Sequence, residues 1–259
     1  MSRSNPNENL KNPASRFYEF KGGTGNFSYY DKELKQNVAI PFPFTFIVID
    51  EKVTVKGFSD SLQSGFWSNE VKNVTKDLIT VRSKRGVEMI GTWNEIKTKM
   101  ASDGVEYCQS VYIGTKIDGK NLELANIQIK GAALGNWIEF RKNNDIMKCA
   151  VTVKSAKAAK KGATNYFEPV FEAIKITEKT NEEAIALDKT LQEYLKVYFA
   201  NNAAETPATT TTTTENKESV TPSKSNQTTY TAPVKNDLPW DEKGNPIVTN
   251  TTEDNEPPF

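Results

Sequence analysis

The sequence predicts a mainly β domain that ends in one amphipathic helix and is followed by a polar tail. Short segments rich in aromatic and β-branched residues, separated by glycine-containing turns, fill much of the first part of the chain, as strands and turns do. An apolar repeat of helical period then runs from residue 184 to residue 198. About 200 residues precede the tail, which is enough for one domain with a sizeable core.

The clearest strand signals form hairpins. Residues 17–21 and 26–30 flank a glycine-rich turn. Residues 105–117 and 121–130 flank Asp118-Gly119-Lys120, which contains the Asp-Gly pair typical of tight hairpin turns. We therefore expect two antiparallel hairpins at these positions.

Further strands are expected in the middle of the chain. Residues 44–50 and 53–58 are rich in Phe, Val and Ile, and the three charged residues Asp50-Glu51-Lys52 between them predict a tight connection. Residues 147–153 alternate apolar and polar side chains, the pattern of a half-buried strand.

One segment is strongly helical. Thr180-Asn181-Glu182-Glu183 matches a capping box, with a threonine at the cap and a glutamate three residues later. The apolar stripe that follows consists of Ala184, Leu187, Leu191, Leu195 and Tyr198. We expect this helix to lay the stripe on the domain and to end near Asn201, and a shorter helix to form over 132–143.

The composition excludes several kinds of chemistry. The chain has no histidine, so histidine-based catalysis and His-ligated metals are impossible. Cys108 and Cys149 form no C-x-x-C pair, and we expect buried thiols of a reduced compartment. We expect no catalytic residue, no metal and no cofactor.

Sequence features also bear on location. The polar N-terminus lacks the apolar run of a signal peptide. The longest apolar stretch, 40–49, is far shorter than the ~20 residues of a membrane-spanning helix. We expect a cytoplasmic protein without a membrane partner; its oligomeric state stays open.

Charge divides the chain near Asn201. The whole chain has 33 basic and 33 acidic residues, but residues 201–259 carry a net −5 and the preceding body a net +5. We expect a domain over 1–200, a disordered Thr/Asn/Pro-rich linker over 201–252, and an acidic interaction tip over 253–259. The tip combines carboxylates, a terminal aromatic ring and the α-carboxylate, which suit a basic-rimmed pocket on a partner. Its partner-binding residues are Glu253, Asp254, Glu256, Pro258 and Phe259.

The body mixes aromatic and basic residues as single-stranded nucleic-acid-binding proteins do, since rings stack on bases and cations follow the phosphates. The candidates for base stacking are Phe17, Tyr29, Tyr30, Phe58, Phe66, Trp67, Trp93 and Tyr112. The candidates for phosphate binding are Arg16, Lys56, Arg82, Lys84, Arg85, Lys154, Lys157, Lys160 and Lys161. The last four belong to a stretch without Asp or Glu, 146–167, and we interpret its part 155–162 as a flexible hairpin tip that extends two strands.

Each candidate also has a plain structural interpretation. Most of the rings are expected in a β core, and lysines in a loop keep a protein soluble. In Tyr29-Tyr30 and Phe66-Trp67, however, successive strand side chains point to opposite faces, so one ring of each pair should be exposed.

The C-terminal residues Glu253-Asp254-Asn255-Glu256-Pro257-Pro258-Phe259 resemble the acidic tip of bacterial single-stranded DNA-binding proteins, which ends in Pro-Phe. Pro257 departs from the isoleucine usual there. The terminal phenylalanine is also similar to the acidic tail of phage single-stranded DNA-binding proteins. In the body, 12–20, 67–71 and 130–134 resemble phage-type members from Bacteroides-like hosts.

This resemblance implies an OB-fold, a five-stranded Greek-key barrel, here with hairpin extensions and the C-terminal helix. It also implies no catalytic activity, single-stranded DNA as a partner, and recruitment of replication and repair proteins by the tip. Two alternatives remain open, a protein-binding adaptor and, less favoured, a carboxylate-metal nuclease.

Overall fold

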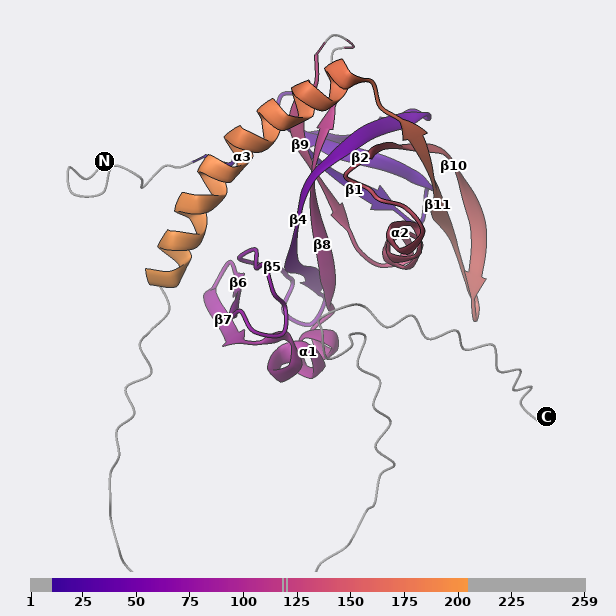
Figure 1. Cartoon of the computed structure of the whole chain (residues 1–259). Helices are drawn as coiled ribbons and strands as arrows, with labels where there is room; N and C mark the ends of the chain where they lie inside the picture. The colour runs from indigo at the N-terminus through magenta and orange to yellow at the C-terminus, as the bar shows by residue number, and fades with distance from the viewer. Residues whose placement is uncertain (1–10, 118, 120, 205–259) are drawn as a thin grey trace, which may run out of the picture.

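A computed structural model describes residues 11–117, 119 and 121–204 of the chain (Figure 1). The strands are β1 (Phe17–Lys21), β2 (Asn26–Asp31), β3 (Gln36–Ile40), β4 (Phe44–Ser59), β5 (Ser64–Ser68), β6 (Ile79–Ser83), β7 (Gly86–Gly91), β8 (Val105–Thr115), β9 (Glu123–Ile129), β10 (Cys149–Lys161) and β11 (Thr164–Lys175). The helices are α1 (Trp93–Ser102), α2 (Ala132–Asn143) and α3 (Glu178–Ala204).

All these strands belong to one mixed sheet in the order β3-β2-β1-β9-β8-β4-β5-β6-β7. β10 pairs with the first part of β4 and with β11, so β10 and β11 form a two-stranded ribbon that branches from the sheet. β1 and β9 run parallel, and the other pairs are antiparallel. The predicted mainly β architecture with a C-terminal helix is confirmed, but the sheet does not close into a barrel.

The long strand β4 is the spine of the sheet. It pairs with β8 along most of its length, and its other edge pairs first with β10 and then with β5. The predicted connection at Asp50-Glu51-Lys52 is therefore wrong, because the strand continues through it with a register shift after Val48. Glu51 has distant partners, because it accepts a hydrogen bond from Trp137 of α2 at 3.0 Å and pairs with Arg141 at 3.1 Å. Buried Lys52 pairs with the neighbouring Asp50.

The expected hairpins are confirmed as β1–β2 and β8–β9, and α2 spans the expected 132–143. The stretch Lys154–Lys161 is not a loop: it continues β10 and pairs with β11 up to the turn at Gly162. Its backbone pairs residue by residue with β11 from Ser155 to Lys161, and this antiparallel ladder makes an extended ribbon more favourable than a loop.

The helix α3 begins earlier and ends later than predicted. It starts at Glu178, and the Thr177 hydroxyl accepts a hydrogen bond from the Thr180 backbone N–H at 3.2 Å. Thr180 therefore lies in the first turn, and the capping box predicted there is wrong. The helix continues to Ala204.

The two faces of the sheet bury different cores. One face, which we call the inner face, packs against α2 around Phe46, Ile127 and Trp137. The strands β5–β7, the lower part of the sheet in Figure 1, pack against α1. The predicted apolar stripe of α3 lies on the outer face, where Leu191 and Leu195 are buried against strand residues. Burying a leucine contributes about 1.5–3 kcal/mol.

Two further features bear on the sequence predictions. Both cysteines are free thiols, with Cys108 buried and Cys149 half-buried. Within the described ranges, no helix combines the length and the apolar character needed to cross a bilayer.

Candidate nucleic-acid interface

The outer face of the sheet brings several predicted residues together. Lys56 of β4 pairs with Trp67 of β5, and Trp67 pairs with Arg82 of β6. Direct partners on neighbouring strands point to the same face, so these three side chains form a row. On the other side of β4, the same face continues through Gln128 of β9 and Glu19 of β1, which are direct partners. We call this surface the outer strip: Phe17, Glu19, Lys21, Tyr30, Lys56, Phe58, Trp67, Arg82, Glu106, Gln128 and Lys130.

Exposed rings occur along the outer strip. Trp67 is 46% exposed, whereas its neighbour Phe66 is only 3% exposed, as the alternation of strand side chains predicts. Phe17 and Tyr30 are exposed on the adjacent strands β1 and β2. Since Tyr18 pairs with Tyr29, the rings of Phe17 and Tyr30 flank that pair and point to the opposite, outer face. Phe58 of β4 is exposed as well.

Three predicted stacking residues are core residues instead. Phe66 and Trp93, the first residue of α1, are buried in the core between α1 and the sheet, and Tyr112 is fully buried beneath α3. A buried ring has no face free for a base, so these predictions are wrong; β-rich cores commonly use such rings. Tyr29 is half-buried, and the Arg16 guanidinium lies over its ring at 4.4 Å, a cation–π contact.

The lysines of the strip share two carboxylates. Glu19 forms ion pairs with Lys21 at 2.7 Å, with Lys130 at 3.7 Å and with Lys56 at 3.9 Å. Lys130 also pairs with Glu106 at 3.5 Å, and Lys56 donates a hydrogen bond to Gln128. Burial alone would raise the pKa of Glu19, but the hydrogen bond from Lys21 and the three nearby charges lower it. Lysines outnumber acids here, so the strip is a surface that can accept an anion.

A pocket of about 250 Å³ opens between α3 and the strip. Lys56, Trp67 and Gln128 line it from the sheet, and Tyr194 and Tyr198 line it from the helix. The two tyrosine rings stack with their centroids 5.7 Å apart. Sequence reasoning placed Tyr198 only in the apolar stripe and missed Tyr194, although two tyrosines four residues apart share one helix face.

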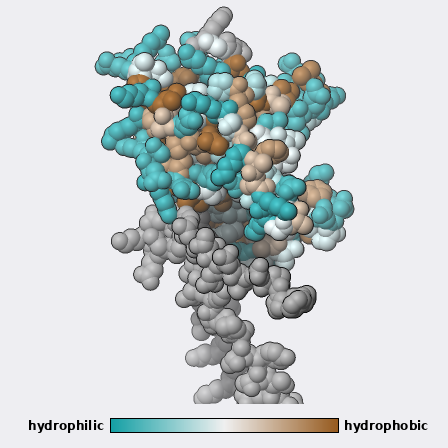
Figure 2. All heavy atoms as spheres, turned by 90° about the vertical axis from the view of Figure 1, so that its right-hand side faces the viewer, coloured by the Kyte–Doolittle hydropathy of each residue, from teal (hydrophilic) through white to brown (hydrophobic). Residues whose placement is uncertain are grey.

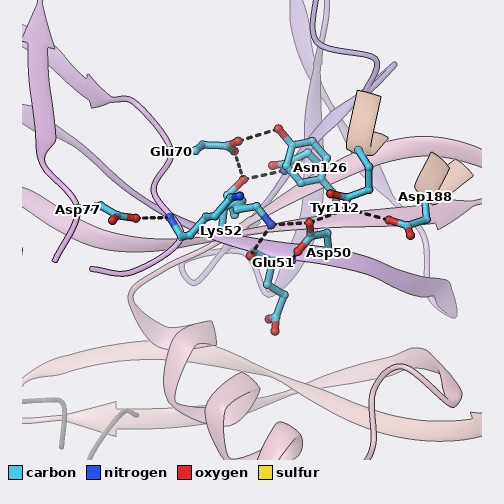
Figure 3. Close-up of polar contacts among 11 residues, drawn as sticks. Asp50, Glu51, Lys52, Glu70, Asp77, Tyr112, Asn126 and Asp188 are labelled. Atoms are coloured by element: carbon cyan, nitrogen blue, oxygen red, sulfur yellow. Dashed lines mark hydrogen bonds and ion pairs between the residues drawn. The ribbon is translucent and has the colours of Figure 1, made fainter. Parts of the chain in front are cut away.

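Glu70, which lines this pocket, belongs to a buried polar network (Figure 3). Tyr112 donates a hydrogen bond to Glu70 at 2.8 Å, and Ser110 donates to its other carboxylate oxygen. Asn126 donates to Ser110 at 2.8 Å, and the Glu70 backbone N–H donates to the Tyr198 hydroxyl at 2.7 Å. Burial raises the pKa of Glu70, against the two hydrogen bonds to its carboxylate. The network ties α3 to the sheet and so fixes one wall of the pocket.

The other predicted phosphate ligands lie elsewhere. Lys84 and Arg85 belong to the β6–β7 turn, where Arg85 makes a two-point contact with Glu88 at 3.0 and 3.2 Å. The four ribbon lysines, Lys154, Lys157, Lys160 and Lys161, lie on β10, on the opposite side of the molecule from β5–β7 (Figure 1).

Acidic residues of β11 face part of the ribbon. Lys154 pairs with Glu172, and Lys157 pairs with Glu168 at 3.9 Å. The side of the molecule that carries the ribbon mixes hydrophilic and hydrophobic residues (Figure 2). The ribbon is therefore a second basic element, separate from the outer strip.

Some predictions fall outside the described residues. The tip residues Glu253, Asp254, Glu256, Pro258 and Phe259, and the linker 201–252 from residue 205 onward, are among them. In the part of the chain that is described, no three Cys, Asp or Glu side chains gather in a way that could hold a metal ion.

Comparisons with known proteins give no family for the chain. No family model, no curated protein and no solved structure matches it.

Proposed function

We propose that the protein is a non-enzymatic single-stranded DNA-binding protein that coats and protects DNA during replication, recombination or repair, largely without sequence preference. One observation carries the proposal: Lys56, Trp67 and Arg82 lie side by side on the outer strip, next to the pocket walled by Tyr194 and Tyr198. Every base has a π face that can stack on a ring, and cations follow the phosphates whatever the sequence.

The outer strip is long enough for several nucleotides. β1 and β5 are separated by β9, β8 and β4, which is about 19 Å across the sheet at the usual spacing of strands. The register also places Phe17 level with Asp50 of β4 and Trp67 level with Lys56, so the two rings are offset by six residues, or about 20 Å, along the strands and lie about 28 Å apart. A DNA strand bound along the outer strip would stack on Trp67 at one end and on Phe17 and Tyr30 at the other. Lys56 lies between them and can contact the phosphates.

The fold, in this proposal, is an opened and extended relative of the oligonucleotide-binding barrel, and the protein acts in the cytoplasm, of a bacterial host if a bacteriophage encodes it. The acidic tip recruits replication and repair proteins. Because the tail carries −5 and the body +5, we also propose that the tail competes with DNA for the basic surface.

A fluorescence titration tests the proposal. Trp93 and Trp137 are buried and Trp67 is half-exposed, so single-stranded DNA should quench Trp67. We expect salt-dependent quenching by an unstructured oligonucleotide, and its loss in Trp67→Phe although binding persists by anisotropy. The variant Trp240→Phe shows how much of the quenching comes from Trp240, the fourth tryptophan of the chain. No salt-dependent binding by either readout would refute the proposal.

A protein-binding adaptor is the second candidate. Leu78, Val87 and Ile90 are exposed on the lower part of the sheet, near a hollow lined by Phe199. Exposed apolar residues that cluster are typical of protein contacts. If the protein is such an adaptor, we expect DNA to change neither the tryptophan fluorescence nor the anisotropy in the titration above. Mg²⁺-dependent cleavage of the oligonucleotide would instead indicate the nuclease.

A further inference from the structure

A cavity outside the outer strip lies at one end of the sheet. It has a volume of about 510 Å³ and forms where the β3–β4 connection, the ends of β8 and β11 and the first turn of α3 meet. Apolar side chains make most of its wall, among them Ile40, Phe44, Leu122 and Ile174. Its volume falls within the ~300–1,000 Å³ of pockets that hold small ligands or a few side chains.

The charged residues that line this cavity are all basic. Arg16, Lys116 and Lys175 line it, and none of the described residues that line it is acidic. An apolar cavity with cations suits a ligand whose bulky apolar group is flanked by carboxylates.

The chain itself contains such a segment. Asp237-Leu238-Pro239-Trp240-Asp241-Glu242 places leucine, proline and tryptophan between acidic residues, within a mostly polar tail. We propose that the cavity is a docking site for this segment, with Leu238 and Trp240 against the apolar wall and the carboxylates near the cations. The proposal does not depend on DNA binding, and it leaves the tip 253–259 available to partners.

The covalent connection allows the contact within one chain. Thr177 and Thr180 line the cavity, so it lies at the start of α3, while the tail leaves the other end of the helix. The 27 residues of α3 span about 40 Å. Residues 205–236, at ~3.3 Å per residue, can span up to about 100 Å. The segment can therefore reach back along the helix to the cavity.

Fluorine NMR of the full chain, labelled with 5-fluorotryptophan, tests the proposal. The Trp240 resonance is identified by its loss in Trp240→Phe. We expect it to differ from the resonance of a free peptide spanning 233–246, and to move to the peptide position in Ile174→Glu. Ile174 is 39% exposed, so this change adds a repelling charge without emptying the core. Unchanged Trp93 and Trp137 resonances would confirm that the variant is folded.

A matched control separates the cavity from a general effect of charge. Ile185→Glu makes the same substitution at a 48% exposed site of α3 that does not line the cavity, and should leave the Trp240 resonance in place. Lys175→Glu should shift it part of the way to the peptide position, and Phe259→Ala should not shift it. A wild-type resonance already at the peptide position, no response to Ile174→Glu, or a position that depends on protein concentration would each overturn the proposal.

Discussion

Lys56 and Trp67 are direct partners across β4 and β5, so an ammonium group and a half-exposed indole ring project from the same face of the sheet. Neither residue is needed to fill a core: the indole is 46% exposed, and the ammonium group contacts Gln128 and the carboxylate of Glu19 at the surface. An exposed ring beside a cation is the minimal unit that can hold one nucleotide by base and phosphate. The first two predictions concern this pair.

Replacing Trp67 with alanine should weaken binding of single-stranded DNA by about 1–3 kcal/mol, the usual contribution of one stacked base. The loss corresponds to roughly 5- to 150-fold in Kd. Anisotropy titrations at fixed low salt measure it. Leu34→Ala in the β2–β3 turn, also at an exposed apolar site, should bind as the wild type does. Equal affinities of the Trp67 variant and the wild type would place the DNA elsewhere.

Replacing Lys56 with alanine should change the salt dependence of binding. Loss of one phosphate contact reduces the slope of log K against log salt by ~0.7 for single-stranded DNA. Titrations at several salt concentrations give the slope. Lys148→Ala is the matched control, because Lys148 is exposed and pairs only with nearby Asp145 among its described neighbours. A slope that falls equally in both variants would argue against a specific role of Lys56.

The carboxyl groups of Glu70 and Glu19 should contribute to the pH dependence of stability with opposite signs. Burial raises the pKa of folded Glu70, so its contribution to stability is fully present below the unfolded pKa and is lost as pH rises through the folded pKa. The hydrogen bond from Lys21 and the neighbouring lysines lower the pKa of Glu19 against the effect of burial. Its contribution is therefore present above the unfolded pKa and is lost as pH falls through the folded one.

Urea unfolding of Glu70→Gln and Glu19→Gln, measured from acid to neutral pH, checks both signs. Relative to wild type, Glu70→Gln should gain stability as pH rises, and Glu19→Gln should lose stability as pH rises. Parallel pH profiles for wild type and either variant would contradict the corresponding assignment.

The sequence predicts the local elements of this fold better than its long-range pairing. Both hairpins and α2 follow from turn residues and from periodicity, which are properties of short segments. Asp50-Glu51-Lys52 looks like a turn because three charged residues interrupt an apolar run. Its partners, Trp137 and Arg141, come from a helix more than eighty residues away. No local pattern reveals that contact.

The candidate site follows the same rule. Alternation within β5 predicts that either Phe66 or Trp67 is exposed, but only the packing of α1 decides which. The pairing of Lys56 with Trp67 and the approach of Tyr194 to the pocket depend on strand order and on the position of α3. Strand order and helix position are features of tertiary structure, and no periodic pattern in a single sequence predicts them.

The attachment of α3 gives a prediction about stability. Leu191 is fully buried between the helix and the outer face, so Leu191→Ala should destabilise the protein by about 2–5 kcal/mol through lost burial and a residual cavity. Urea unfolding monitored by circular dichroism measures the loss. Ile185→Ala, at an exposed position of the same helix, should change stability by no more than about 0.5 kcal/mol. A small effect of Leu191→Ala would mean that the helix is not held by this contact.

Removal of the acidic tail should strengthen DNA binding at low salt. The helix α3 continues to Ala204, so the deletion should begin at residue 205 to keep the helix intact. Residues 205–259 carry the same net −5 as the tail from 201, and their loss removes a covalently attached competitor for the basic body. The gain should shrink as salt rises, because screening weakens the competitor and the DNA contacts together. Neutralising Glu253, Asp254 and Glu256 as amides, at full length, should give part of the gain. An unchanged or lower affinity at low salt after the deletion would refute competition between the tail and DNA.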